Sequence, residues 1–332
     1  MIVFLEESLI NIIKHLSSKK YLELNHVGDK AYSSISTKEF LSGSKNKVVE
    51  PLNSKSNFKV KIVAEITTNH LGNRDLLIQI VRRAKESGAD LVKVQKRNVE
   101  TFYSQKELDS YYFSEFGTTF REYRHGLELS KEDFLVLDKE CKKIGIDWFA
   151  SVLDKESLDF ILEFDPKLIK IPSTISDFSD YHDYVAKRYK GDIVVSTGLT
   201  SIDYEDYIIK KFKNNSRIYL LQCTSSYPAE LSDLNLSAIP AIQQRYQCQV
   251  GYSGHERGVG VGPGAVLLGA SVIERHFTMD RTLKGPDHAA SLEPRGLDLL
   301  VKRSNNYWKA LGAPKKEIQE SELANRLKFR GY

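Results

Sequence analysis

Short β-branched runs alternate with longer amphipathic segments from Phe58 onward, and eight such pairs follow one another along the chain. Short apolar runs are typical of buried parallel strands, and the segments between them have the spacing of helices that cover a sheet. The expected strands are Val60–Ile66, Leu91–Gln95, Asp147–Ala150, Leu168–Ile171, Ile193–Ser196, Ile218–Gln222, Gln249–Tyr252 and Ser271–His276. The clearest helical patterns are Arg74–Glu86, Lys131–Lys143, Lys155–Phe164, Ser201–Phe212, Leu236–Arg245 and Gly296–Leu311.

Eight consecutive βα units predict an α/β fold in which the strands close into a (β/α)₈ TIM barrel. A closed barrel is favoured over an open doubly wound sheet, because no GxGxxG turn follows the first strand. The chain has 332 residues. That length accommodates a barrel of about 250 residues together with a small attachment.

Residues 1–57 do not follow this rhythm. They are rich in Ser, Lys and Asn, and they lack sustained apolar periodicity after a helix-like stretch at Ser8–Ser17. This composition predicts a short N-terminal appendage that is partly flexible. We therefore expect two parts, the appendage at residues 1–57 and the barrel at residues 58–332.

Charge and hydropathy exclude several classes of protein. The net charge of +4 is small for this length and the charged residues are interspersed, so no nucleic-acid partner is expected. Glu6 and Glu7 interrupt the apolar residues of Met1–Ile13, and no basic segment precedes them, so neither a signal peptide nor a membrane span is expected. The three cysteines are widely separated, which fits reduced thiols and a cytoplasmic location.

One connection is longer than the others. It covers Arg97–Gly126, after the second expected strand, and it is rich in aromatic residues: Phe102, Tyr103, Tyr111, Tyr112, Phe113, Phe116, Phe120 and Tyr123. An aromatic patch that packs the connection onto the barrel is one interpretation, and a substrate lid or an oligomer contact are the others.

Polar residues collect at the carboxyl ends of the expected strands, where the functional groups of a (β/α)₈ barrel lie. In chain order they are Glu65, Asn69, His70, Lys93, Gln95, Ser151, Lys170, Ser173, Ser196, Thr197, Thr224, Ser225, Tyr227, Ser253, His255 and His276. Lysines supply positive charge and hydroxyls supply directional hydrogen bonds, so their convergence suits a small, highly charged anion such as phosphoenolpyruvate. A single lysine at such a place is as often a member of a buried ion pair.

His255 and His276 end the seventh and eighth expected strands, which are neighbours in a barrel. Two adjacent imidazoles can bind a divalent metal and leave positions open for water and substrate. A lone histidine at either place is more often a hydrogen-bonding residue of the core. The pairing, next to the turn Gly285–His288, favours metal binding.

The motifs at these positions resemble those of the sialic acid synthase family, which makes N-acetylneuraminate, legionaminate and pseudaminate from phosphoenolpyruvate. The resemblance covers roughly residues 59–328. The matching stretches are Ala64–Ile66 with Asn69–Gly72, Val92–Gln95, Lys170–Ser173, Ser196–Leu199, Leu221–Pro228, Val250–His255 and Ile273–Thr278 with Gly285–His288.

The resemblance implies roles for individual residues. His255 and His276 would bind the divalent metal, with Mn²⁺ expected and Mg²⁺ or Co²⁺ as alternatives. Glu65, Lys93, His255 and His276 would be catalytic. The substrates would be bound by Asn69, Gln95, Lys170, Ser173, Ser196, Ser225, Tyr227, Ser253 and Asp287.

The resemblance also implies the chemistry. A transferase of this type condenses phosphoenolpyruvate with an amino-sugar aldehyde, forms a C–C bond and releases phosphate. Two other interpretations stay open: a condensation or aldol enzyme that acts on a different aldehyde, and a catalytically silent barrel that serves as a binding or regulatory subunit. An aldol lyase should place a Schiff-base lysine in an apolar pocket, whereas both lysines here sit among anion-binding hydroxyls.

The sequence departs from the family pattern in several places. Gly254 stands where the family has Asp, Gln222 where it has His, Val152–Leu153 where it has Thr-Pro, and Thr174–Ile175 where it has Gly-Glu. We expect most of these changes to lie on the sugar side of the site. Family members generally continue into a C-terminal antifreeze-like domain that reaches the partner's site in a homodimer, and this sequence ends at Tyr332. Another chain, the appendage or the aromatic connection would then supply a lid, or the acceptor would need none.

Overall fold

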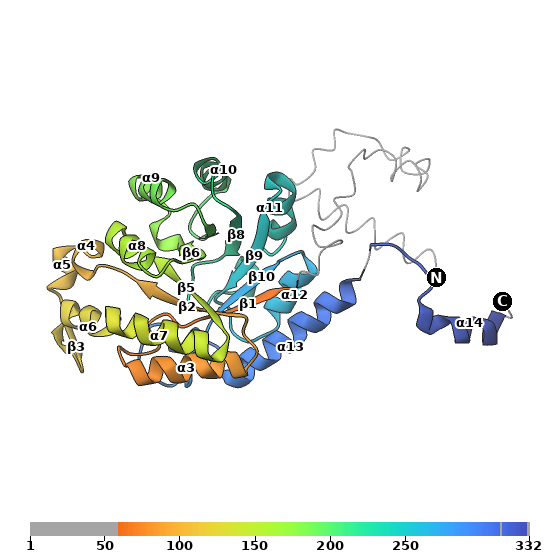
Figure 1. Ribbon diagram of the computed structural model, residues 1–332, viewed down its shortest axis with the longest axis horizontal. Helices are drawn as coiled ribbons and strands as arrows, with labels where there is room; N and C mark the ends of the chain where they lie inside the picture. Colours follow the sequence, from red (N-terminus) through yellow and green to blue (C-terminus); the bar gives the residue numbers. More distant parts are fainter. Residues whose placement is uncertain (1–58, 313, 331–332) are drawn as a thin grey trace. The chain divides into compact units, whose positions relative to one another are not determined.

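The computed structural model describes residues 59–312 and 314–330. The expected appendage at residues 1–57, with its helix at Ser8–Ser17, lies outside the described residues. Figure 1 shows the strands of the described part at the centre and the helices arranged around them.

The described chain contains one closed barrel, in which the strands follow the order β1-β10-β9-β8-β7-β6-β5-β2. Every neighbouring pair is parallel. The strands are β1 Lys61–Glu65, β2 Leu91–Lys96, β5 Asp147–Val152, β6 Leu168–Ile171, β7 Asp192–Ser196, β8 Ile218–Cys223, β9 Gln249–Gly254 and β10 Val272–His276. The predicted (β/α)₈ barrel is confirmed, with strand ends that differ from the expected ones by at most two residues.

Helices follow the strands and cover the barrel (Figure 1). Their bounds are α3 Arg74–Glu86, α7 Lys131–Ile144, α8 Lys155–Leu162, α9 Ser179–Arg188, α10 Ile202–Lys211, α11 Ala238–Tyr246, α12 Val261–Leu267 and α13 Pro294–Leu311. The chain continues into α14, Leu323–Arg330. None of the helices in the described ranges has both the length and the apolar character needed to cross a membrane.

Local capping marks the start of some of these helices and not of others. Asn73 caps α3 by accepting a hydrogen bond from the Leu76 amide, and Ser130 forms a capping box with Asp133 at the start of α7. Helix α9 starts after Phe178 with no side-chain cap, so the sequence carries no start signal there.

Alternate residues of each strand point into the barrel, and they form two layers of different character. Near the amino ends of the strands the inward side chains are apolar and buried, and they pack together: Val63, Phe149, Val194, Leu221 and Val272. Near the carboxyl ends the inward residues are polar, beginning with Glu65, Lys93 and Lys170. The barrel is therefore filled with apolar side chains below and lined by polar side chains at its mouth.

The long connection after β2 is folded in the structure. It contains α4 Val99–Phe102, α5 Gln105–Leu108, the hairpin of β3 Tyr111–Ser114 and β4 Gly117–Thr119, and α6 Phe120–Leu127. Its aromatic rings pack on one another, with 5.1 Å between the ring centroids of Tyr103 and Phe120 and 4.4 Å between those of Tyr112 and Tyr123. Phe102 packs against the barrel core, and Phe102 and Tyr103 line the cavity at its mouth, whereas Tyr111 and Phe113 are exposed. Packing onto the barrel therefore accounts for only part of the aromatic patch, and the lid and the oligomer contact stay predictions.

Candidate active site

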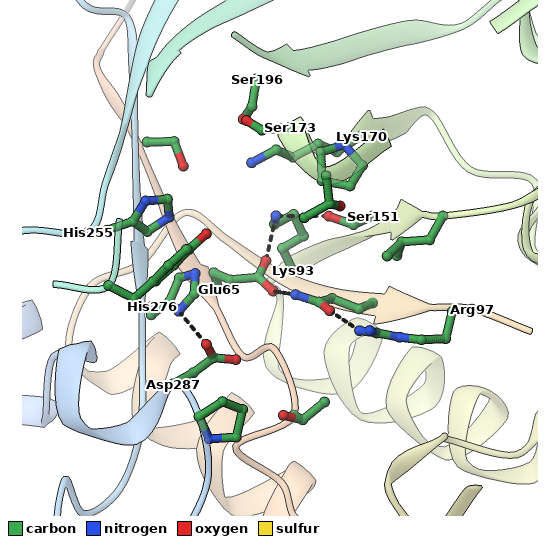
Figure 2. Close-up of a pocket in the computed structure, with 18 of the residues that line it drawn as sticks. Glu65, Lys93, Arg97, Ser151, Lys170, Ser173, Ser196, His255, His276 and Asp287 are labelled. Atoms are coloured by element: carbon green, nitrogen blue, oxygen red, sulfur yellow. Dashed lines mark hydrogen bonds and ion pairs between the residues drawn. The ribbon is translucent and has the colours of Figure 1, made fainter. Parts of the chain in front are cut away.

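A cavity of about 330 Å³ opens at the carboxyl ends of the strands. Figure 2 shows side chains from many strands pointing into it. Residues of the predicted site that line it are Glu65, Lys93, Gln95, Lys170, Ser173, Ser196, Tyr227, Ser253, His255, His276 and Asp287. Apart from Asn69 and Ser225, the structure thus brings the predicted site residues together.

Glu274 is the centre of the charge network under this cavity. Its Oε1 atom lies 2.5 Å from Lys170 Nζ and 3.2 Å from Lys93 Nζ, and it accepts a hydrogen bond of 3.1 Å from Ser253 Oγ. The side chain is inward because it is two residues from Val272, which fills the apolar layer below. One carboxylate therefore fixes two lysines that arrive from different strands.

Glu65 is the second buried carboxylate of the network. Its Oε2 lies 2.6 Å from Lys93 Nζ, and its Oε1 accepts hydrogen bonds from the Thr67 amide at 3.0 Å and from Gln95 Nε2 at 3.1 Å. These three contacts hold the carboxylate in one orientation at the wall of the cavity (Figure 2).

The pKa values of these groups shift in opposite directions. Burial alone would disfavour every charge, but Lys170 and Lys93 outweigh it at Glu274 and hold the pKa of that carboxyl far below its usual range. The two carboxylates likewise raise the pKa of Lys93 against its burial. At Glu65 burial dominates and raises the pKa, with the nearby Glu274 acting in the same direction. Glu65 is accordingly the carboxyl in this pair that is better suited to take up a proton.

Hydroxyl groups surround Gly198, just beyond the end of β7. A Cβ atom on this residue would lie 2.3 Å from Ser225 Oγ, 2.8 Å from Ser173 Oγ and 3.2 Å from Cys223 Sγ. Ser196, at the end of the same strand, has a buried Oγ with no hydrogen-bond partner. Hydroxyls that converge on an open space beside Lys170 form a cradle for an anion such as phosphate.

His255 and His276 lie side by side, with ring centroids 5.1 Å apart, and the ring of Tyr227 covers His255 at 4.2 Å. His255 Nδ1 is 2.9 Å from the Thr224 carbonyl oxygen. Because a carbonyl only accepts, Nδ1 carries a proton, and in the neutral ring the lone pair is then on Nε2. Burial lowers the pKa of His255, but the nearby Cys223 thiol outweighs it and raises that pKa. His276 Nδ1 is buried and makes no hydrogen bond, and burial together with His255 holds the pKa of His276 well below its usual value.

This pair fits a divalent metal by its donor chemistry. Neutral imidazole nitrogens with free lone pairs are ligands for such ions, and a backbone carbonyl that fixes the tautomer of His255 is the usual outer support of a ligating histidine. Within the described residues no group of three or more His, Cys, Asp or Glu side chains gathers as a closed metal site. The residues thus suit an open site, in which the protein fills only some of the positions around an ion.

Asn69 and Ser225 lie outside the lining of this cavity. The Asn69 amide donates hydrogen bonds of 2.9 Å to the Phe277 carbonyl and to Ser291 Oγ, so it ties the chain after β1 to the chain after β10. Ser225 contributes to the cradle from behind Gly198. The role of Asn69 in substrate binding stays a prediction, because the hydrogen bonds of its amide are made to other residues of the protein.

Two departures from the family pattern are not on the sugar side, contrary to expectation. A Cβ on Gly254 would point at Glu256 Oε2, 2.5 Å away, on the outer face of the barrel. Gln222 also points outward, and its amide donates a hydrogen bond to the Leu234 carbonyl. Strand alternation explains both, since each residue adjoins an inward neighbour. Leu153 and Thr174, by contrast, do line the cavity.

The structure adds functional candidates that sequence reasoning did not select. They are Glu274 at the centre of the network, Cys223 in the cradle, and Arg97 and Arg124 at the edge of the cavity. Glu274 could have been found from strand alternation, because it lies two residues before His276 on the same inward face. Arg124 carries no such signal, since its helix belongs to the long connection rather than to the barrel.

The fold and this mouth define a class of protein: a (β/α)₈-barrel enzyme with an anion-binding centre and an adjacent pair of imidazoles. The chain belongs to the NeuB family, whose model matches residues 80–316. This confirms the resemblance to the sialic acid synthases.

Individual relatives agree with this assignment. Human N-acetylneuraminate-9-phosphate synthase is 37% identical over 267 residues, which cover 79% of this chain and 74% of the relative. N,N'-diacetyllegionaminic acid synthase of Legionella pneumophila is 35% identical, covering 80% and 77%. A solved structure of N-acetylneuraminic acid synthetase from Leptospira borgpetersenii, in complex with citrate, is 30% identical with a TM-score of 0.72, covering 82% of this chain and 93% of that one.

Proposed function

We propose that the protein condenses phosphoenolpyruvate with the aldehyde of an open-chain amino sugar, giving a sialic-acid-like 2-keto-3-deoxy acid and phosphate. The observation that carries the proposal is the buried network in which Glu274 holds Lys93 and Lys170 beside the hydroxyl cradle. Phosphoenolpyruvate has a carboxylate and a phosphate on adjacent atoms. Two fixed ammonium groups and several hydroxyls match that pair of anions.

Each part of the site has a task in this reaction. Ser173, Ser196 and Ser225 bind the phosphate oxygens, while the two lysines neutralise charge on the phosphate and the carboxylate. Held in this way, the enol carbon C3 faces the side of the mouth where His255 and His276 lie. Fixing both reactants in one orientation removes most of the entropic cost of their encounter.

The bonds change as follows. The C3 carbon attacks the aldehyde carbon and forms the new C–C bond, and the aldehyde oxygen takes up a proton. Water adds to C2 and gives its proton to Glu65, whose raised pKa suits a general base. The C2–O bond then breaks, phosphate leaves with the bridging oxygen, and loss of the remaining hydroxyl proton yields the keto group.

His255 and His276 would hold the divalent ion, which when bound polarises the aldehyde and orients it. Mn²⁺, the ion that the family resemblance implies, is our proposal, with Mg²⁺ or Co²⁺ as alternatives. We also propose that the protein works in the cytoplasm and as a homodimer. Size-exclusion chromatography with light scattering tests the assembly, and a monomer at micromolar concentration would exclude the dimer.

The decisive experiment measures phosphate release from phosphoenolpyruvate with Mn²⁺ across a panel of amino-sugar aldehydes, with mass spectrometry of the product. We expect release that requires one sugar and a product that contains all carbons of both substrates. Release without any sugar, or none with any sugar despite bound metal, would overturn the proposal. The aldol alternative is disfavoured because both lysines are paired with carboxylates rather than isolated in an apolar pocket.

A further inference from the structure

Arg124 is a buried cation whose hydrogen-bonding capacity is largely unused. It lies on α6 in the long connection, lines the cavity, and is only 6% exposed. Its Nε and Nη2 atoms have no hydrogen-bond partner, and it forms no ion pair within the described part of the chain. The guanidinium lies against the rings of Tyr103 and Tyr123, with 5.3 and 5.9 Å to their centroids. A guanidinium this deeply buried normally has an anionic partner.

The charges around Arg124 leave a positive surplus. Arg97 also lines the cavity, and its Nε lies 3.1 Å from Glu128 Oε1. Lys96 Nζ is 3.7 Å from the other oxygen of the same carboxylate. Arg97 and Lys96 thus share Glu128, while Arg124 forms no ion pair among the described residues, so three positive charges lie near one negative charge. Asp287, which also lines the cavity, faces His276 at 3.8 Å and forms an ion pair with neither arginine.

The two arginines lie far around the barrel from the phosphate cradle. Arg97 directly follows β2, whereas Ser196 ends β7 and Ser225 follows β8. In the barrel order these strands are three and four places from β2, so they face it across the mouth. Figure 2 shows Arg97 and Ser196 on different sides of the cavity. An anion at the arginines is therefore not the phosphate that the cradle holds.

We propose that Arg97 and Arg124 bind a phosphate monoester on the acceptor sugar, at the end remote from its aldehyde. This inference rests on the proposed function, because the cavity between the two anion sites is where the acceptor would lie. A phosphate monoester carries nearly two negative charges at neutral pH, which matches the surplus of two around Glu128. The unpartnered Nε and Nη2 of Arg124 can donate paired hydrogen bonds to phosphate oxygens. Arg97, whose Nη atoms donate to Tyr103 and Gln95, adds positive charge beside them. The acceptor is then a phosphorylated amino-sugar aldehyde rather than the free sugar.

The test compares two acceptors that differ only in this group, N-acetylmannosamine and its 6-phosphate, with the Mn²⁺-loaded protein. We expect kcat/KM to be at least about a hundredfold higher for the phosphorylated acceptor. In Arg124→Met the ratio of the kcat/KM values for the two acceptors should fall by about tenfold to a hundredfold, while the KM for phosphoenolpyruvate stays unchanged. Arg124→Lys should retain part of the preference, because the charge remains but the fork is lost.

Arg121→Ala is the matched control. Arg121 is on the same helix, but it binds Glu100 and Asp109 on the surface and does not line the cavity. Its replacement should leave the ratio between the two acceptors as it is.

A binding measurement keeps the inference testable if turnover or folding fails. The alditol of N-acetylmannosamine 6-phosphate has no aldehyde, so its binding can be followed by calorimetry without reaction. We expect it to bind the wild type at least tenfold more tightly than the unphosphorylated alditol. Equal affinities, or equal kcat/KM values with an unchanged Arg124→Met variant, would overturn the inference and leave the synthase proposal standing. Absence of product from every sugar, with tight binding of the phosphorylated alditol, would count against the synthase proposal instead.

Discussion

Glu274 Oε1 accepts a hydrogen bond from Lys170 Nζ at 2.5 Å in the interior of the barrel, where the side chains of Glu274 and Lys170 are 2% and 4% exposed. They come from β10 and β6, which are not neighbours in the barrel order. The contact thus spans the lumen, and it fixes Lys170 without using a hydroxyl of the cradle. A lysine placed in this way can meet an incoming anion without reorganising, which is the basis of electrostatic preorganisation.

The ion pair of Glu274 and Lys170 should make the stability difference between the wild type and Glu274→Gln depend on pH. The pKa of Glu274 is lowered in the folded protein, so its stabilising contribution is complete above the ordinary value of 4.5 and is lost as the pH falls below it. At pH 7 we expect Glu274→Gln to lower the free energy of unfolding by about 3–5 kcal/mol, because two lysines lose a buried partner. Denaturant unfolding between pH 7 and pH 3 measures this difference, which should narrow below pH 4.5.

The control for this prediction is Glu140→Gln. Glu140 pairs with Arg82 at the surface, so its replacement should change stability little at any of these pH values. A wild-type advantage over Glu274→Gln that stays constant from pH 7 to pH 3 would contradict the role assigned to the buried carboxylate.

Removal of one imidazole should separate metal binding from folding. His276→Ala should abolish turnover and weaken Mn²⁺ binding at least tenfold, because half of the paired donors is lost. The far-ultraviolet circular dichroism should stay as in the wild type. Calorimetric titration with Mn²⁺ tests the binding, and His70→Ala is a useful comparison because His70 is buried outside the cavity lining. Near-normal turnover of His276→Ala would remove the histidine pair from the metal site.

Filling the cradle should affect phosphoenolpyruvate selectively. Gly198→Ala places a methyl group 2.3 Å from Ser225 Oγ and 2.8 Å from Ser173 Oγ. Its backbone does not require glycine, so the effect comes from lost space. We expect the KM for phosphoenolpyruvate to rise at least tenfold in steady-state assays, since hydrogen bonds to a charged group are lost.

Gly264→Ala provides the comparison, because its Cβ meets no other atom within 4 Å and the residue lies in α12. This variant should retain its KM and gain up to about 1 kcal/mol of stability from helix propensity. An unchanged KM in Gly198→Ala would show that the phosphate lies elsewhere.

Gly254→Asp restores the residue usual in the family and should nevertheless destabilise this chain. The added Cβ would lie 2.5 Å from Glu256 Oε2 and 2.6 Å from a ring carbon of Tyr252, next to the buried pair of Glu256 and Arg275. Overpacking and a second carboxylate should together cost more than about 2 kcal/mol, measured by chemical unfolding. Combining it with Glu256→Gly should recover part of the loss, because the two sites share a partner. Full additivity of the two changes would argue that the carboxylates do not compete.

The fold was predictable because barrel strands leave a strong periodic signal. Helix α3 was predicted with its observed bounds, and Asn73 caps its start; β6 was also predicted with its observed bounds, since its residues are mainly apolar and β-branched. Helix α12 was not predicted as a separate element, because Gly262, Pro263 and Gly264 lie within it and oppose a helical interpretation. In α12 the packing of the helix against the rest of the barrel therefore outweighs the low helix propensity of its residues.

The site was predictable where residues of the barrel strands carry it. Strand ends selected Lys93, Lys170 and His276, since the carboxyl ends of all strands meet at one mouth. The ion-pair partners of these side chains were harder to predict than their positions at the strand ends. Nothing in the order of residues shows that Glu274 bridges two lysines across the lumen, or that Arg124 reaches the cavity from a helix between strands. Such contacts depend on how the connections fold over the barrel.

The apolar layer of Val63, Phe149 and Leu221 gives the barrel a sealed floor beneath the two lysines. Substrates therefore enter and products leave through the same opening at the mouth of the barrel. The substrate that binds deeper in the cavity must bind before the other substrate, and the product formed in the deeper position must be released last. We therefore expect an obligatory sequence of arrivals and departures, visible as competitive inhibition by phosphate against phosphoenolpyruvate and as a different pattern against the sugar.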